Sequence, residues 1–346
     1  MYRRYLAKRV AYGILMYVAM IFVYSTLFNS VADRTMRSLI DEQLAQEATR
    51  YRNLSEDQLR NLVESRREQK YDQYHLNDPL LERIFFRAIR TIAFDYGNST
   101  TMKAPNGDRL VIRIILEALP KTIVLFTTQI AIVTVLGVAM GLYAAQKPGG
   151  LLDRTTSLLT MITNGLPAWW LGMLAIMFFA YTVPIFPSGG LRSNPPPVGF
   201  LGMLDFLWHL ALPLLTLVVL GIWGTAYLVR NIVLSNLQED YVMAARARGI
   251  PERAVLFGHT LRTSMPAIMT LAVLGLFSSI GGSIIVEGIF GWPGLGNLYF
   301  VAVQTNDVPV LMGSLSVQTL VSMLGFVILD LIYGLLDPRV KVGGKA

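Results

Sequence analysis

The stretch FLWHLALPLLTLVVLGIWGTAYLV, residues 206–229, contains no Asp, Glu, Lys or Arg. An α-helix needs about 20 consecutive apolar residues to cross the hydrocarbon core of a bilayer, so this stretch is predicted to span a membrane. Five further apolar stretches of similar length occur along the chain. The six predicted spans are 10–32, 120–144, 157–183, 206–229, 265–290 and 310–336.

The composition excludes a water-soluble enzyme. Of the 346 residues, 53% are apolar and 15% are charged, and the mean hydropathy is +0.48. Long apolar stretches of helical length predict an all-α, polytopic membrane protein with about six transmembrane helices. The chain contains no cysteine. This excludes a disulfide framework, a thiolate zinc site and a cysteine nucleophile.

The distribution of Lys and Arg predicts the orientation of the spans. The formal net charge is +7. The N-terminus, the connections 145–156 and 230–264 and the C-terminal tail together hold 14 Lys and Arg, whereas the short connections on the opposite side hold only Arg192. The long segment 33–119 does not count, because long translocated segments do not follow the positive-inside rule. The short connections therefore predict that both termini are cytoplasmic.

The first predicted span has two interpretations. Basic residues precede it, and Ser30-Val31-Ala32 resembles the cleavage site of a signal peptide. Its apolar core of about 19 residues is longer than the roughly 7–15 residues of a signal peptide, which favours a retained helix. Cleavage would leave five spans and the same cytoplasmic connections.

Residues 33–119 form a charged segment between the first two spans. The stretch 33–121 carries 15 basic and 14 acidic residues. Within it, Ser55-Glu56-Asp57-Gln58 matches a capping box and predicts a helix that begins near Glu56. A solvated helical cap and a docking surface for an external partner both remain open for this segment.

The longest predicted cytoplasmic connection, 230–264, contains a short helix. Good helix formers run from Leu237 to Arg248, acidic residues precede arginines along this stretch, and Gly249 follows as a stop signal. Small alanines would allow another surface to approach closely. On these grounds alone, an ordinary juxtamembrane helix and a partner-docking helix are equally acceptable.

The stretch Glu239–Gly249 resembles the cytoplasmic EAA loop of ABC importer permeases, in which an acidic residue and small residues precede a glycine. The loop sequence is close to that of the dipeptide/oligopeptide (peptide/nickel) subfamily. The chain resembles the first of the two permease types of that subfamily. The Ile-x-Leu-Pro element that usually follows this loop is reduced here to its proline, Pro266. Residues 33–76 stand where the subfamily usually has a proline-glycine-aspartate element just after the first span. Further resemblance to this subfamily lies in 77–80, 95–99, 286–296, 306–310 and 329–339.

The resemblance implies a type I ABC importer permease fold and names candidate residues. It implies that a helix of the 230–264 connection docks on a separate ATPase and couples it to the spans. The ATPase-coupling candidates are Glu239, Asp240, Tyr241, Ala244, Ala245, Arg246, Arg248 and Gly249. The structural-motif candidates are Glu287, Trp292, Pro293, Gly294, Gly296, Asp330, Asp337, Pro338 and Arg339.

The same resemblance implies an organisation and a set of partners. The partners are a second related permease, two ATPase subunits that hold ATP and Mg²⁺, and an extracytoplasmic binding protein. This chain has no G-x-x-x-x-G-K-[ST] loop, so it is expected to be a transport subunit without its own ATP site or cofactor. The expected parts are 1–32 with the first span, 33–119 outside, the permease core 120–340 with its coupling loop 230–264, and the cytoplasmic tail 341–346.

Polar residues inside the spans are candidates for a translocation path, because polar groups in lipid are costly. These candidates are Gln129, Asn164 and Gln318. Glu287, near the outer end of the fifth predicted span, is a candidate structural tie or a substrate contact. No charged residue lies persuasively at a span midpoint, which disfavours an ion relay. Pro167 and Pro213 permit kinks in the third and fourth spans.

Three other function classes remain. A membrane-embedded enzyme is disfavoured because the three histidines, His75, His209 and His259, are dispersed and no H-E-x-x-H motif occurs. A secondary transporter is disfavoured because no inverted repeat is visible. A membrane scaffold would explain the docking helix but not the polar residues within spans. Within the favoured class, the resemblance implies a dipeptide or oligopeptide substrate, with oligosaccharides as the alternative.

Overall fold

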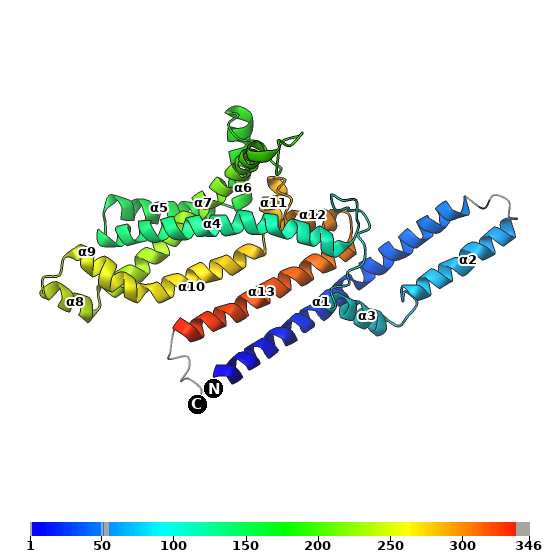
Figure 1. Ribbon diagram of the computed structural model, residues 1–346, viewed down its shortest axis with the longest axis horizontal. Helices are drawn as coiled ribbons and strands as arrows, with labels where there is room; N and C mark the ends of the chain where they lie inside the picture. The colour runs from blue at the N-terminus through cyan, green and yellow to red at the C-terminus, as the bar shows by residue number, and fades with distance from the viewer. Residues whose placement is uncertain (1, 50, 52–54, 337–346) are drawn as a thin grey trace. The chain divides into compact units, whose positions relative to one another are not determined.

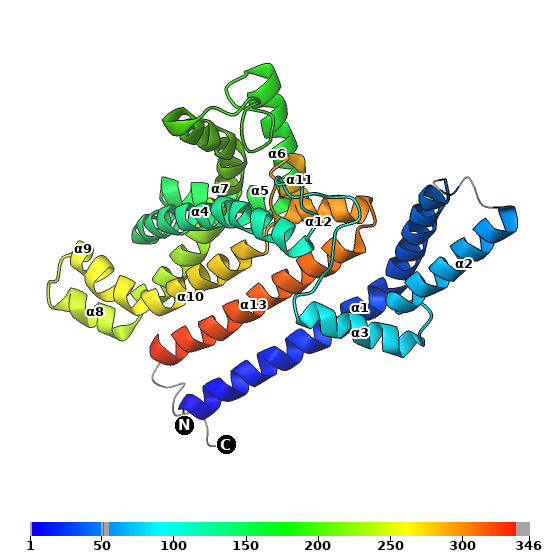
Figure 2. The same cartoon turned by 45° about the vertical axis from the view of Figure 1, so that its right-hand side comes forward.

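A computed structural model describes residues 2–49, 51 and 55–336, and in these ranges the regular structure is helical. Figure 1 and Figure 2 show the helices in two views. The helices are α1 (Tyr2–Ala48), α2 (Glu56–Gln73), α3 (Leu80–Ile92), α4 (Val111–Gln146), α5 (Leu151–Gly165), α6 (Ala168–Ile176), the π-helix η1 (Met177–Thr182), α7 (Gly199–Leu237), α8 (Asp240–Ala247), α9 (Glu252–Ala254), the π-helix η2 (Val255–Thr260), α10 (Leu261–Ile280), α11 (Ile284–Ile289), α12 (Leu295–Gln304) and α13 (Val308–Leu336).

Five of the helical stretches are long and apolar enough to cross a membrane, and a bent pair forms a sixth candidate. The five stretches are Leu6–Ala48, Val111–Gln146, Gly199–Leu237, Glu252–Ile280 and Val308–Ile328. They contain or overlap five of the predicted spans. The predicted all-α, polytopic fold is therefore confirmed for the described residues.

The third predicted span, 157–183, is wrong as a single helix. The chain bends by 94° between α5 and the continuous pair formed by α6 and η1. Leu166 is extended (φ −95°, ψ 123°), because the residue before a proline avoids the helical region. Pro167 then precedes the first turn of α6. The proline therefore breaks this span instead of only kinking it.

The fifth predicted span, 265–290, is also wrong at its C-terminal end. Helix α10 ends at Ile280, and Gly282 has a φ of +67°. Ser283 then accepts a hydrogen bond from the backbone N–H of Val286 and so caps the separate helix α11. The apolar run continues through this break, which is why hydropathy alone joined the two helices.

The chain forms two compact units. Unit 1 comprises Met1–Leu6, Ala118–Asn297 and Leu324–Ala346, and unit 2 comprises Ala7–Glu117 and Leu298–Met323. In both views of unit 1, α8 and α9 lie at one end of the long helices and α11 lies at the other. Within unit 1, the connection that contains α8 and α9 is therefore well separated from the one that contains α11.

Helices α4 and α7 of unit 1 pack closely through glycines. A Cβ added to Gly141 would lie 2.6 Å from the carbonyl oxygen of Ala226, and one added to Gly137 would lie 2.8 Å from Thr225 Cγ2. These distances are below van der Waals contact, so the helices approach at a distance that only glycine permits. Val229, also on α7, is buried beside the same surface.

Unit 2 is held together by polar contacts between its two segments. The hydroxyl of Ser316 lies 2.7 Å from the hydroxyl of Tyr17 and 3.0 Å from that of Tyr96. Burial raises the pKa of Tyr96 to about 12, with the Ser316 hydrogen bond acting in the opposite direction. Tyr24 adds a hydroxyl contact of 3.0 Å to Thr319. These contacts join α1 and the 95–100 loop to α13.

The carboxylate of Asp307 fixes the start of α13 against the same loop. Asp307 is fully buried and accepts hydrogen bonds from Ser99 Oγ at 2.6 Å and from the backbone N–H groups of Thr100 and Thr101 at 3.0 Å. Thr101 Oγ1 lies 2.9 Å from the same oxygen. Since buried polar groups are costly unless paired, these donors hold the loop and the helix start together.

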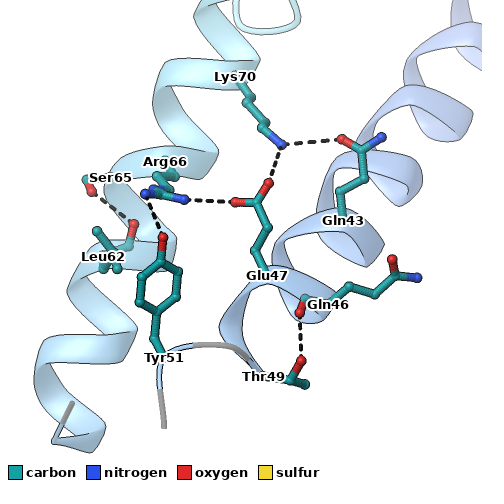
Figure 3. A network of polar contacts seen from close by, with 9 residues as sticks. All are labelled: Gln43, Gln46, Glu47, Thr49, Tyr51, Leu62, Ser65, Arg66 and Lys70. Atoms are coloured by element: carbon teal, nitrogen blue, oxygen red, sulfur yellow. Dashed lines mark hydrogen bonds and ion pairs between the residues drawn. The ribbon is translucent and has the colours of Figure 1, made fainter. Parts of the chain in front are cut away.

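Helices α1 and α2 form a hairpin beyond the first apolar run. Ile40 and Leu44 of α1 are buried with Leu76, which follows α2, and Val63 and Tyr71 of α2 pack against them. Figure 3 shows the polar edge of this hairpin, where Glu47 accepts a 2.9 Å hydrogen bond from Arg66 and lies 3.7 Å from Lys70. Ser55 caps α2 and forms both bonds of the capping box with Gln58. The predicted helix from Glu56 is therefore confirmed.

Candidate functional site

The connection between α7 and α10, residues 238–260 and here named the α8 loop, presents a short helix. Glu239 is extended (φ −71°, ψ 147°) and precedes α8, while α7 continues to Leu237. The predicted helix 237–248 is therefore two helices separated by a break at 238–239. After α8, Gly249 has a φ of +76°, a conformation that glycine adopts without strain. The predicted glycine stop is confirmed.

The inner face of α8 packs on the chain itself. Val242 and Ala245 are buried in a small cluster with Val255, against Leu237 and Ile250. The side chain of Ala245 is therefore not available to a partner, in contrast to the expectation for the paired small residues. The cluster fixes α8 to the helices that follow it.

The outer face of α8 is exposed and carries most of the predicted coupling residues. Tyr241 is 40% exposed and its hydroxyl lies 2.7 Å from Thr263 Oγ1. Arg246 is half-buried and pairs with Glu252 at 2.7 Å, so it acts within the loop. The predicted coupling residues with exposed side chains or backbone are Glu239, Asp240, Tyr241, Ala244, Arg248 and Gly249.

Hydrogen bonds join the ends of the two long helices that flank the α8 loop, α7 and α10. Asn236, in the last turn of α7, donates a 2.7 Å hydrogen bond to Ser264 Oγ on α10. Ser264 in turn donates to the carbonyl oxygen of Thr260 at 2.8 Å. Helix α8 itself packs on the last residue of α7 through its buried cluster and contacts Thr263 of α10 through the Tyr241 hydroxyl. A push on α8 would therefore reach both α7 and α10.

The connection after α10, residues 281–297 and here named the α11 loop, is built around Glu287. The side chain of Glu287 is fully buried. It accepts a 2.9 Å hydrogen bond from Thr122 Oγ1 of α4 and a 3.0 Å bond from the backbone N–H of Asn297. Thr122 Oγ1 also accepts from the N–H of Leu295 at 2.7 Å. These buried hydrogen bonds, here named the Glu287 tie, join the loop to α4.

Trp292 is the largest fully buried side chain of the same loop. Its indole N–H donates a 3.0 Å hydrogen bond to the carbonyl oxygen of Lys121, and its ring lies 5.9 Å from that of Phe206. Two glycines allow the close packing: a Cβ at Gly294 would lie 2.5 Å from Glu287 Oε2, and one at Gly296 would lie 2.6 Å from the backbone of Ser283. Pro293 lies between Trp292 and Gly294 in the chain.

The three predicted path residues do not all share one unit. A Cβ at Gly221 of α7 would lie 3.0 Å from Gln129 Nε2, and one at Gly224 would lie 3.9 Å from Asn164 Oδ1. Gln129 and Asn164 thus lie beside neighbouring turns of α7. Gln318 lies on α13 within unit 2.

The C-terminal motif is only partly described. Asp330 lies within α13. Asp337, Pro338 and Arg339 lie outside the described residues.

The sequence reasoning missed several residues of unit 1. Thr122 completes the Glu287 tie, yet it lies in an apolar span with no motif around it. Arg230 forms a two-pronged pair with Asp153, at 2.7 and 2.9 Å, and Asp153 also accepts from the N–H of Gly149 at 2.8 Å. Opposite charges at the ends of two predicted spans are the signal that could have found this pair. Among the described residues, no cluster of His, Cys, Asp and Glu has the arrangement of a metal site.

Comparisons with known proteins agree with this architecture. A family model described as "Binding-protein-dependent transport system inner membrane component" matches residues 137–342. The chain is 30% identical to the oligopeptide transport system permease protein AppB of Bacillus subtilis (strain 168), over 80% of this chain and 85% of that protein. It is also 30% identical to the dipeptide transport system permease protein DppB of the same organism, over 79% and 83%.

A solved structure of the inward-facing MetNI methionine ABC transporter is similar to 67% of this chain and 99% of that chain, with a TM-score of 0.47 and 20% identity. The family model matches more than half of the chain. The predicted resemblance to ABC importer permeases is thereby confirmed. The chain belongs to the family of inner membrane components of binding-protein-dependent transport systems.

Proposed function

We propose that this chain forms half of the translocation path of an ATP-driven importer for dipeptides or oligopeptides. The relatives AppB and DppB are named as oligopeptide and dipeptide permeases and match most of the chain. An extracytoplasmic binding protein delivers the substrate, and a second, related permease supplies the other half of the path. Two ATPase subunits bind ATP and Mg²⁺ and drive the cycle.

The observation that carries the proposal is the two-faced helix α8. Its inner face, with Val242 and Ala245, is locked to the chain, while Tyr241, Met243 and Ala244 are exposed. A coupling element needs such an arrangement, because force must enter through an exposed face and leave through packed contacts. ATP binding shifts the conformation only through its differential affinity for the closed ATPase pair.

The proposed orientation has both termini and the α8 loop in the cytoplasm. The excess of Lys and Arg in the short connections on that side supports it. The α11 loop lies at the other end of unit 1 and so faces the binding protein (Figure 1). The first helix is proposed to remain in the mature protein, since Tyr17 and Tyr24 of α1 both contact α13.

The test is a charge placed on the exposed face of α8. In the assembled complex, Ala244→Asp is expected to abolish co-purification of the ATPase without changing the amount of inserted chain. Ala45→Asp is the matched control, because Ala45 is also an exposed helical alanine but lies in the segment beyond the first apolar run. ATPase co-purification at the control level with Ala244→Asp would refute the coupling role of α8.

Substrate class needs a separate measurement. In proteoliposomes that contain the complete complex, transport-coupled ATP hydrolysis is expected to rise with dipeptides or oligopeptides bound to the binding protein. Oligosaccharides are the comparison ligands. Stimulation by oligosaccharides alone would contradict the peptide assignment and leave the coupling role of α8 intact.

A further inference from the structure

Helix α3 of unit 2 has an exposed apolar side that the transport function does not explain. Leu81 is 78% exposed and Phe85 is 57% exposed, and Ile89 completes the stripe one turn further on. These positions are four residues apart, so their side chains lie on one face of the helix. Large contiguous apolar surfaces on a protein mark a contact with a membrane or with another protein.

The opposite side of α3 is cationic. Arg83, Arg87 and Arg90 follow each other at spacings of four and three residues, which places them on one face. This face borders a cavity of about 360 Å³ that is also lined by Met36, Tyr96 and Met312. A helix with an apolar side and an arginine side has the pattern of a helix that lies in the plane of a membrane surface.

Contacts with α1 show at which level α3 lies along the first membrane-spanning helix. The ring of Phe85 lies 5.9 Å from that of Phe22, inside the apolar run of α1. One turn further along α1, Ser25 Oγ donates a 2.8 Å hydrogen bond to the carbonyl oxygen of Ile84. The apolar side of α3 is therefore directed toward the membrane-spanning part of α1.

The arginine side meets α1 where its apolar run ends. Arg87 donates hydrogen bonds of 2.7 Å to Asn29 and 3.0 Å to Asp33, and Arg83 pairs with the other oxygen of Asp33. Phe22 and Asp33 are 11 residues apart, which is about 16 Å along a helix at 1.5 Å per residue. Helix α3 thus crosses α1 at the boundary between its apolar and polar parts.

We propose that α3 is an interfacial helix embedded in the head-group layer of the lipid bilayer, with Leu81, Phe85 and Ile89 among the acyl chains and the arginine side at the level of the lipid phosphates. Its occupant is the bilayer, because the exposed apolar surface of α3 continues that of α1, on which Val23 and Leu27 are 48% and 66% exposed. Arg83 and Arg87 are already paired with Asp33, so the choice of occupant rests on the continuous apolar surface. The proposed orientation of the chain places α3 in the outer leaflet.

This interfacial helix would give unit 2 a fixed depth in the membrane. The hairpin formed by α1 and α2 continues from the same boundary, so the depth of α3 sets the height at which that hairpin starts. The hairpin itself is polar, and α2 contains no buried residue. Helix α3 is the element of the 33–110 segment to which we assign the lateral membrane contact.

Spin labelling tests the proposal, and the absence of native cysteines makes it direct. A nitroxide is attached to Leu81→Cys, Phe85→Cys or Ile89→Cys in the complete complex, reconstituted in phosphatidylcholine vesicles. Accessibility to oxygen and to a water-soluble nickel chelate gives the depth of each label. Met16→Cys on α1 is the membrane control, and Arg60→Cys on α2 is the aqueous control. The same complex with the unsubstituted chain is labelled in parallel. Because that chain has no cysteine, any signal comes from labelled partner subunits.

The ratio of oxygen to nickel accessibility at 81, 85 and 89 is expected to be severalfold higher than at 60 and lower than at 16. A ratio equal to that at 60 would place α3 in water and overturn the proposal. Labels shielded from both reagents would show that a protein partner covers the helix, which also overturns it. Addition of the impermeant chelate to one side of oriented vesicles reports the leaflet separately, so an inverted topology would not be confused with a wrong depth.

Discussion

The α8 loop and the α11 loop of unit 1 share a short helix and a glycine turn but differ in where their acidic side chains lie. Each joins helices through a short helix, and in each an acidic residue precedes a glycine with positive φ, Gly249 in one and Gly291 in the other. In the α11 loop, Glu287 is fully buried. In the α8 loop, Glu239 and Asp240 are exposed.

The difference comes from what the neighbouring helix offers. Helix α4 presents Thr122 Oγ1 and the carbonyl oxygen of Lys121 to the α11 loop, which bonds both. The α8 loop has an apolar inner cluster instead, and the side chains of Glu239 and Asp240 lie on its exposed outer side. A buried tie should therefore contribute mainly to stability, and an exposed helix mainly to partner binding.

The largest stability loss is expected for Trp292→Ala in the α11 loop. Removing a fully buried aromatic side chain leaves a cavity and typically costs about 3–5 kcal/mol, and the hydrogen bond to Lys121 is lost as well. Thermal unfolding of the purified complex, followed by circular dichroism, measures the effect. Trp170→Ala is the matched control, because Trp170 is 42% exposed. Equal losses for the two tryptophans would contradict the structural role assigned to the buried ring of Trp292.

A smaller loss is expected for Glu287→Ala. The substitution leaves Thr122 Oγ1 and the N–H of Asn297 without their acceptor, and an unsatisfied buried group costs about 1–3 kcal/mol. Glu287→Gln keeps one carbonyl oxygen and should recover part of that loss in the same unfolding measurement. If transport fell with Glu287→Gln while stability stayed at the wild-type level, Glu287 would act on substrate instead of on the fold.

The sequence predicted the spans well where hydropathy alone decides them, and less well where the backbone changes direction. Helices α7 and α13 follow from apolar length. The 94° bend at Leu166 and the break at Gly282 depend on local dihedral angles, which a run of apolar residues conceals.

The candidate sites were predictable to the extent that their residues form local motifs. Glu287 and Trp292 were predicted because residues 286–296 form one local motif that resembles the peptide-importer subfamily. Thr122 is 165 positions away from Glu287 and became visible only through the fold. Likewise, the burial of Ala245 depends on Val255, which helical spacing within α8 does not reveal.

In the α8 loop, Gly249→Ala is expected to cost about 1–2 kcal/mol, because a side chain makes the left-handed conformation unfavourable. Gly249 has a φ of +76° and open space around it, so the cost is conformational and not steric. Gly258→Ala is the control, since that site also has open space but no positive φ. The two variants are compared by thermal unfolding, and equal stabilities would contradict the role assigned to the glycine turn.

The smallest effect is expected for Glu252→Gln, which removes the partner of Arg246. The Arg246 and Glu252 side chains are 35% and 58% exposed, and exposed ion pairs contribute about 0–1 kcal/mol. The unfolding midpoint should therefore stay within a degree or two of wild type, about the shift such an energy produces in a chain of this size. A loss as large as that of Glu287→Ala would mean that the α8 loop is held as firmly by its ion pair as the α11 loop is by its buried carboxylate. The exposed face of α8 would then have a structural role of its own, beyond the docking role that its exposure supports.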